Sequence, residues 1–238
     1  GRALSDADRA ATLGALHMAE REIFAAEGQH VKFLVVGMGR QGGREISYGS
    51  DMDALFVHRL AERGDPAKAD AQAQKLAARL RSLLTQGAAI RGEYPLQLDA
   101  DLRPEGRNGP LSRSLDSFRE YYRRWMEVWE RQALLRARPV AGCDELSRDF
   151  MELVDEVRYG EAPSPGQVRE IRRIKARVEA ERLPRGADPA RHVKLGRGAL
   201  SDVEWLVQLL QLQHAHRRKV LRTTSTLSAL DAWWMRSC

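Results

Sequence analysis

Two short apolar runs with a glycine-rich segment between them constrain the fold of this chain more than any other feature. Val31–Val36 is rich in β-branched residues and is followed directly by glycine, a pattern that predicts a buried strand. Met52–Val57 predicts a second strand. The segment between them contains Gly42 and Gly43, which would let the backbone approach a phosphate group with its N–H groups pointing at it.

The glycines also match the dinucleotide-binding fingerprint G-x-G-x-x-G, but two details argue against that fold. A dinucleotide-binding fold needs a full helix after the glycines, whereas Gly49 and Ser50 follow Gly42 by only seven and eight residues. It also needs an acidic residue at the end of the next strand, but Asp51 and Asp53 stand at its start. Dinucleotide binding is therefore the weaker interpretation.

The acidic residues favour a metal site instead. Asp51 and Asp53 are two residues apart on a predicted strand, so their carboxylates project from the same face and repel unless a cation neutralises them. Oxygen ligands beside a phosphate favour Mg²⁺ or Mn²⁺. Asp99, on a later predicted strand, would complete a set of three carboxylates suited to in-line attack on phosphorus with two metal ions. The competing interpretation of an Asp-x-Asp pair is a simple turn cap.

The remaining pattern predicts an α/β part followed by helices. Helices are expected over Ser5–Glu27, where Ser5 and Asp8 resemble a capping box, and over Pro66–Gln86. Tyr94–Leu102 alternates in polarity and predicts a half-buried strand. No strand is expected beyond the loop at 104–110.

Beyond that loop, we expect one long helix over Ser114–Arg138, with Phe118, Tyr122, Trp125 and Trp129 as its buried stripe. In the helix expected over Ser201–His216, Ser201 and Glu204 form a capping box. Its core stripe would be Val203, Leu206, Val207 and Leu210. Two more helices are expected, over Asp144–Val157 and Pro165–Leu183. The final tryptophans suggest a fragment of a longer protein.

Four separated motifs occur in order along the chain. The first is Gly37-x-Gly39-x-x-Gly42-Gly43-x-Glu45 with Ser50-Asp51-x-Asp53-x-x-Phe56. The others are Leu98–Arg103 with Pro104-x-Gly106-x-x-Gly109-Pro110, Trp129-Glu130-x-x-Ala133-Leu134-x-Arg136-Ala137-Arg138, and Lys194-x-Gly196-x-Gly198-x-x-x-Asp202-x-Glu204-Trp205. Together they resemble the signature of glutamine synthetase adenylyltransferases, which belong to the DNA polymerase β-like nucleotidyltransferase superfamily.

The resemblance implies a small mixed β-sheet nucleotidyltransferase domain over residues 1–110 and an all-helical domain over 111–238. It implies transfer of AMP from ATP to a tyrosine hydroxyl of glutamine synthetase, a reaction that regulates nitrogen assimilation. Asp51, Asp53 and Asp99 would hold the metal ions, and Asp99 is also the candidate base. The residues expected to bind the nucleotide are Gly42, Gly43, Ser50, Arg103, Arg107 and Lys194. The position of Asp101 is usually Arg in this family.

Enzymes of this family have two halves, one that transfers and one that removes the adenylyl group. Asp202, Glu204 and Trp205 resemble the transferring, C-terminal half. The alternatives are the removing half, which uses phosphate to release ADP, and a domain that only senses nucleotide or docks a partner. The resemblance also implies a PII-type nitrogen-signalling protein as a partner of the rest of the parent chain.

Composition bears on the remaining partners. The net charge is +6, from 39 Lys and Arg against 33 Asp and Glu, which suits an anionic ligand such as a nucleotide. Arginines share their helices with glutamates, so a nucleic-acid nucleotidyltransferase is disfavoured and no nucleic-acid partner is expected. No apolar run approaches membrane-spanning length, and Gly1–Asp6 contains no signal core. We therefore expect a cytoplasmic protein without a membrane partner.

Overall fold

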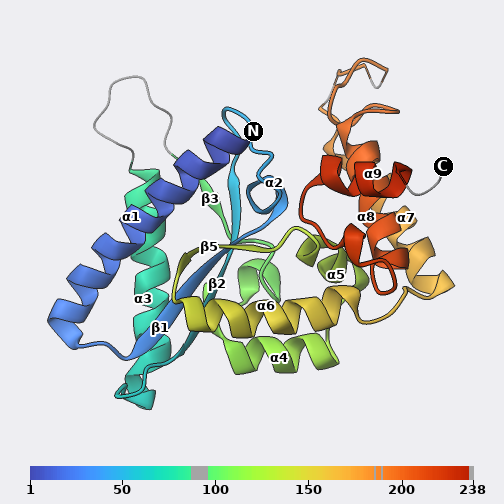
Figure 1. The fold of residues 1–238 in the computed structure, drawn as a ribbon. Coiled ribbons are helices and arrows are strands. Elements are labelled where there is room, and N and C mark those ends of the chain that lie inside the picture. The colour runs from blue at the N-terminus through green and yellow to red at the C-terminus, as the bar shows by residue number, and fades with distance from the viewer. Residues whose placement is uncertain (87–95, 185, 189, 236–238) are drawn as a thin grey trace. The chain divides into compact units, whose positions relative to one another are not determined.

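The computed structural model describes residues 1–86, 96–184, 186–188 and 190–235. The chain forms two compact units (Figure 1). The first contains Gly1–Trp125 and Arg136–Val154, and the second contains Met126–Leu135 and Asp155–Cys238.

The first unit contains a small mixed sheet, as predicted. Its strands are β1 (Val31–Gly37), β2 (Met52–Leu60), β3 (Leu98–Asp99), β4 (Ser112–Ser114) and β5 (Arg138–Gly142). The order is β3-β2-β1-β5, and β4 also pairs with β2. Strand β1 is antiparallel to β2 and β5, whereas β2 is parallel to β3 and β4. The parallel pairing places the start of β2 beside β3.

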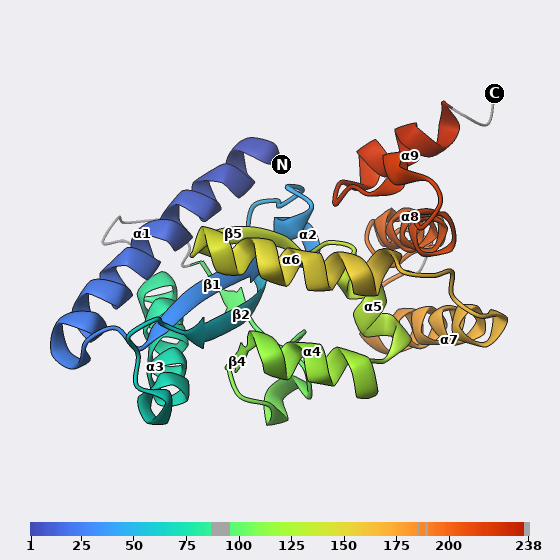
Figure 2. The same cartoon turned by 60° about the horizontal axis from the view of Figure 1, so that its bottom comes forward.

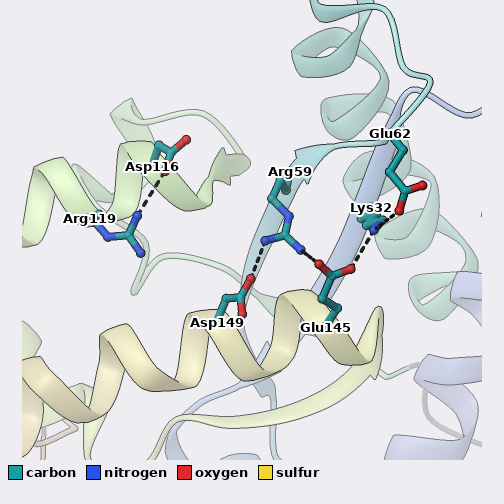
Figure 3. Close-up of polar contacts among 7 residues, drawn as sticks. All are labelled: Lys32, Arg59, Glu62, Asp116, Arg119, Glu145 and Asp149. Atoms are coloured by element: carbon teal, nitrogen blue, oxygen red, sulfur yellow. Dashed lines mark hydrogen bonds and ion pairs between the residues drawn. The ribbon is translucent and has the colours of Figure 1, made fainter.

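Helices cover both faces of this sheet because β1 and β2 are apolar at nearly every position. On one face, Phe33 and Phe56 pack in a core with α1 (Arg2–Glu27) and α3 (Pro66–Thr85). On the other face, Lys32 and Arg59 pair with carboxylates of α6 (Asp144–Tyr159), as Figure 3 shows. Helix α4 (Leu115–Arg124) lies beside α6 (Figure 2), with Phe118 against Phe150.

The long helix predicted over Ser114–Arg138 is wrong. Helix α4 ends at Arg124, and a second helix, α5 (Val128–Leu134), starts at a capping box of Glu127 and Glu130. The break coincides with the passage of the chain from the first unit to the second. Trp125 is therefore 68% exposed rather than part of a buried stripe, whereas Phe118 and Tyr122 are buried as predicted.

Two strands were missed and one was overextended. Both β4 and β5 lie beyond the loop after which no strand was expected. Among the described residues of the predicted strand Tyr94–Leu102, only Leu98–Asp99 is a strand, while Tyr94 and Pro95 lie outside the described residues. The predicted cap at Ser5 is also wrong, because α1 begins at Arg2 and the buried Ser5 hydroxyl accepts a hydrogen bond from the Ile46 amide.

The second unit is helical, as predicted for the later part of the chain. Its described elements are α5, the end of α6, α7 (Pro165–Arg182), α8 (Leu200–His214), α9 (Thr226–Trp234) and a short 3-10 turn, Lys219–Leu221. Its core contains Tyr159, Ile171 and Leu212. No described helix combines the length and apolar character needed to cross a membrane.

The predicted start and core stripe of α8 need correction. Ala199 is the N-cap, so Ser201 and Glu204 do not form a capping box. Instead, the Asp202 carboxylate accepts a hydrogen bond from the Gly198 amide at 2.6 Å and pairs with Lys175. The buried face contains Val207 and Gln211, whose amide donates to two backbone carbonyls, while two of the residues predicted to be core are exposed: Val203 and Leu206.

Candidate active site

The strand register brings two of the predicted carboxylates together. Asp53 on β2 is the direct partner of Asp99 on β3, one position after Met52 and Leu98. Adjacent strands lie about 4.8 Å apart, and partners in a parallel pair project to the same face. Asp51 immediately precedes β2 and shares that face by alternation. Asp51 is exposed, whereas Asp53 and Asp99 are half-buried.

The glycine loop is shaped around the Asp53 carboxylate. Gly39 begins the short helix α2 (Gly39–Gly42) with φ of 48°. A Cβ at Gly39 would lie 2.1 Å from Oδ2 of Asp53, so the carboxylate lies directly against the glycine Cα. The Met38 amide also donates to the Asp53 carbonyl at 2.8 Å. The loop therefore has space for this carboxylate only because residue 39 has no side chain.

Gly42 and Gly43 have roles within the loop. A Cβ at Gly42 would lie 1.6 Å from the carbonyl oxygen of Arg136, so only glycine fits. The N–H groups of Gly42 and Gly43 donate to the carbonyls of Met38 and Gly39 at 2.8 and 3.2 Å. These amides close the turn, and their predicted contact with a phosphate stays a prediction.

Arginines of the third motif hold this loop. Arg138 donates to the carbonyls of Gly42 and Gln41 at 3.1 and 3.0 Å. The buried Arg136 donates to Glu45 at 3.0 Å. Motifs far apart in the sequence thus meet behind the Asp53 carboxylate, which explains why Glu45 and Arg136 both belong to the pattern.

A pocket of about 360 Å³ opens beside the carboxylates. It is lined by Asp51, Arg81, Gln97, Leu98, Asp99, Ala100, Asp101, Arg103 and Arg107. Four of the predicted site residues therefore share one cavity. Sequence reasoning missed Arg81, an exposed residue near the end of α3, because nothing in the local pattern of that helix distinguishes it from Arg79.

Two arginines of this pocket, Arg103 and Arg107, are paired with Asp101. Its Oδ2 accepts a hydrogen bond from Arg107 Nε at 2.6 Å, and its Oδ1 lies 3.6 Å from Arg103 Nη1. The hydrogen bond and charge of Asp101 raise the pKa of the Arg107 guanidinium above its ordinary value. The Asp101 amide donates to Oδ1 of Asp99 at 2.7 Å. The Asp99 carboxylate thus accepts from the backbone of its own turn, while the Asp101 carboxylate contacts the arginines.

The other predicted residues lie apart from this pocket lining. The Ser50 hydroxyl lies 2.8 Å from that of Ser47, which accepts a hydrogen bond from Arg40 at 3.2 Å. Lys194 is exposed and belongs to the second unit, and its contact with nucleotide stays a prediction.

The donor set fits a divalent metal ion by chemistry and by register. Carboxylate oxygens are the ligands that Mg²⁺ and Mn²⁺ prefer, and Asp53 and Asp99 are side by side. Within the described residues, no three His, Cys, Asp or Glu side chains converge closely enough to form a ligand cluster. Binding would therefore require rotation of these carboxylates about their side-chain bonds.

Comparison with known proteins gives the family. The sequence profile of glutamate-ammonia ligase adenylyltransferase matches residues 7–153. That range covers more than half of the chain and includes Asp51, Asp53, Asp99, Arg103 and Arg107. The chain belongs to the glutamate-ammonia ligase adenylyltransferase family. The family predicted from the four motifs is thereby confirmed.

Relatives in this adenylyltransferase family carry the name bifunctional glutamine synthetase adenylyltransferase/adenylyl-removing enzyme. The Streptomyces avermitilis protein is 54% identical over 98% of this chain and 23% of its own length. The Mycobacterium tuberculosis protein is 56% identical over 83% of this chain and 20% of its own length. The Leifsonia xyli protein is 55% identical over 92% and 21%. The chain thus spans about a fifth of each of these relatives.

Proposed function

We propose that this chain transfers AMP from ATP to a tyrosine hydroxyl of glutamine synthetase and releases pyrophosphate. The observation that carries the proposal is the register that sets Asp53 beside Asp99, with Asp51 on the same face, at an arginine-lined pocket. Such a site combines anionic metal ligands with cationic groups for phosphates. The transferring half is favoured by the resemblance at Asp202, Glu204 and Trp205.

The carboxylates have the first role in this mechanism. Asp51 and Asp53 would hold two divalent cations, and Asp99 would share one of them. Bound cations would neutralise the triphosphate and lower the pKa of the attacking hydroxyl. Asp99 would accept the tyrosine proton as that oxygen attacks the α-phosphorus. Gly39 has no side chain and so leaves the space that the Asp53 carboxylate occupies beside the loop.

The cationic residues have the second role. Arg81, Arg103 and Arg107 line the pocket and would bind the phosphate oxygens by charge-assisted hydrogen bonds. They would hold the β- and γ-phosphates as these leave as pyrophosphate. In this proposal, a PII-type regulator acts through parts of the protein outside this chain.

The test uses ATP labelled at the α-phosphate, Mg²⁺ or Mn²⁺, and unmodified glutamine synthetase. We expect label on the synthetase, and we expect its loss in D51N and D53N variants that unfold at the same temperature as the parent. Asp116 on α4 supplies the matched control, because it is an exposed carboxylate paired with Arg119 at 3.3 Å (Figure 3). Retained transfer in D51N or D53N contradicts the metal assignment.

The removing activity is the second candidate, because the relatives carry both activities in their name. There, phosphate would attack the tyrosyl-AMP bond and release ADP, and the same carboxylates would act. The parallel assay offers adenylylated synthetase and phosphate. ADP release without transfer would reverse the choice of half, and silence in both with ATP bound would favour a sensing domain.

A further inference from the structure

We infer that Asp101 is a built-in competitor for the phosphate-binding arginines, pairing with Arg107 in the ligand-free chain and giving it up to the triphosphate. The inference rests on the proposed function, because it concerns the same pocket. It assigns to Asp101 a role in setting nucleotide affinity, distinct from the metal-binding role of Asp99.

The geometry allows Arg107 to move while Arg103 stays. Arg107 is 85% exposed, and within the described part of the chain its side chain hydrogen-bonds only to Asp101, at 2.6 Å. Arg103 is only 12% exposed and donates to the carbonyls of Gly109 and Ala100 at 3.2 and 2.8 Å. Arg107 can therefore swing toward a ligand while Arg103 remains fixed in the wall of the pocket.

The charges show what a ligand must displace. Among the described residues that line the pocket, three are carboxylates and three are arginines: Asp51, Asp99 and Asp101, with Arg81, Arg103 and Arg107. A phosphate that approaches Arg107 also approaches Asp101, which repels it at short range. A triphosphate offers Arg107 more acceptor oxygens than one carboxylate does, so it displaces Asp101 from Arg107. Its affinity is lowered by the loss of that ion pair and by repulsion from Asp101.

The backbone keeps Asp101 in this position. Its amide donates to Asp99 Oδ1 at 2.7 Å, which ties the Asp101 backbone to the strand end that carries Asp99. The competitor is thus placed by the same strand end that supplies Asp99 to the site. Replacing its carboxylate with an amide would leave this backbone bond intact.

Binding of inorganic tripolyphosphate to the 238-residue chain, measured by calorimetry in EDTA at low salt, tests the inference. D101N should bind about three- to tenfold more tightly than the parent, as expected for removal of one close like charge that is partly screened by water. R107Q should bind more weakly. In an R107Q background, D101N should lose most of its gain, because the two effects are coupled. D116N, which removes a similar exposed carboxylate, should leave affinity unchanged.

Three results would overturn the inference: no tighter binding by D101N, an equal gain in D116N, or a full gain in the R107Q background. Undetectable binding by every variant would also overturn it, because the arginines must take phosphates. If D101N unfolds early, D101S repeats the test. Tripolyphosphate binding does not depend on AMP transfer, so the two assays are independent. Tighter binding by D101N without AMP transfer to glutamine synthetase contradicts only the proposed function. AMP transfer without tighter binding by D101N contradicts only this inference.

Discussion

At the residue scale, single atoms decide which side chains the site accepts. Gly39 combines a positive φ with a carboxylate oxygen at the place of its missing Cβ. His58 is buried, yet both of its ring nitrogens are hydrogen-bonded, Nδ1 with Ser112 and Nε2 with Asp70, each at 2.8 Å. The contacts of Gly39 and His58 each lead to a prediction about a substitution at that position.

G39A should abolish adenylyl transfer, because the new methyl group displaces the Asp53 carboxylate. Part of its stability cost, about 1 kcal/mol, comes from the positive φ alone. Gly186 provides the control, because it has φ of 82° and a Cβ added there would meet no described atom beyond its chain neighbours within 4 Å. G186A should show the backbone cost in thermal unfolding but full transfer. Equal transfer by the two variants would contradict the fit between Gly39 and Asp53.

Acidification should destabilise the chain through His58. Burial lowers its pKa below the ordinary 6.5, an effect larger than the opposing hydrogen bond and charge of Asp70. As the pH falls, the unfolded state therefore takes up the proton first. The contribution of His58 to the free energy of unfolding is complete above pH 6.5 and is lost as the pH drops from there through the lowered pKa.

The measurement is urea unfolding from pH 8 to pH 5. H58Q should flatten this part of the pH dependence, whereas H17Q, at an exposed histidine of α1, should keep it. An unchanged slope in H58Q would rule out His58 as its source.

At the element scale, the sequence predicted the helices and strands that have an apolar or periodic pattern. It missed strand β4, which is held in place by side-chain contacts. The central strands and most helices followed from β-branched runs and helical spacing. Strand β4 has no such pattern in Ser112–Ser114. Its first residue is instead bound by Gln74 of α3, whose amide donates to the Ser112 carbonyl at 2.6 Å and accepts from its N–H at 2.9 Å. Such a contact exists only after the fold brings α3 beside the sheet.

Q74A should therefore loosen β4 from the sheet. Loss of two hydrogen bonds to a buried strand residue should cost about 2–4 kcal/mol of unfolding free energy. K68A, at an exposed position of the same helix, should change stability by less than about 0.5 kcal/mol. Denaturant unfolding of both variants gives the comparison, and a similar small effect for both would mean that Gln74 does not anchor the strand.

At the scale of the whole molecule, the carboxylates could be predicted and the arginine arrangement could not. Strand alternation groups Asp51 with Asp53, but it places Asp99 and Asp101 on one face, so the choice of Asp99 came from the resemblance to the family. The position of Arg81 near the pocket, and the pairing of Asp101 with Arg107, depend on how distant segments meet. The net charge of +6 likewise gives the excess of basic over acidic residues but not where the charges lie on the structure.

That balance makes a prediction about nucleic acid. Many arginines are paired with acidic side chains, as in Arg59 with Glu145 and Arg79 with Glu22, so the chain should bind single-stranded RNA only weakly. We expect dissociation constants in the nonspecific range of roughly 10⁻⁴ to 10⁻⁶ M at physiological salt. Fluorescence anisotropy with a labelled RNA gives the measurement. Salt at about 200 mM strongly weakens contacts to nucleic-acid phosphates. Nanomolar binding that persists at that salt concentration would favour a nucleic-acid substrate.

The path of the backbone between the two units limits how recombination can exchange the gene segment that encodes the first unit. The chain leaves the first unit after Trp125, returns at Arg136 and leaves again after Val154. The residues that brace the glycine loop, Arg136 and Arg138, therefore come after the excursion. No single continuous stretch of gene encodes the first unit without part of the second. Recombination that moves the pocket together with these bracing arginines must carry α5 with it, because α5 precedes Arg136 in the sequence.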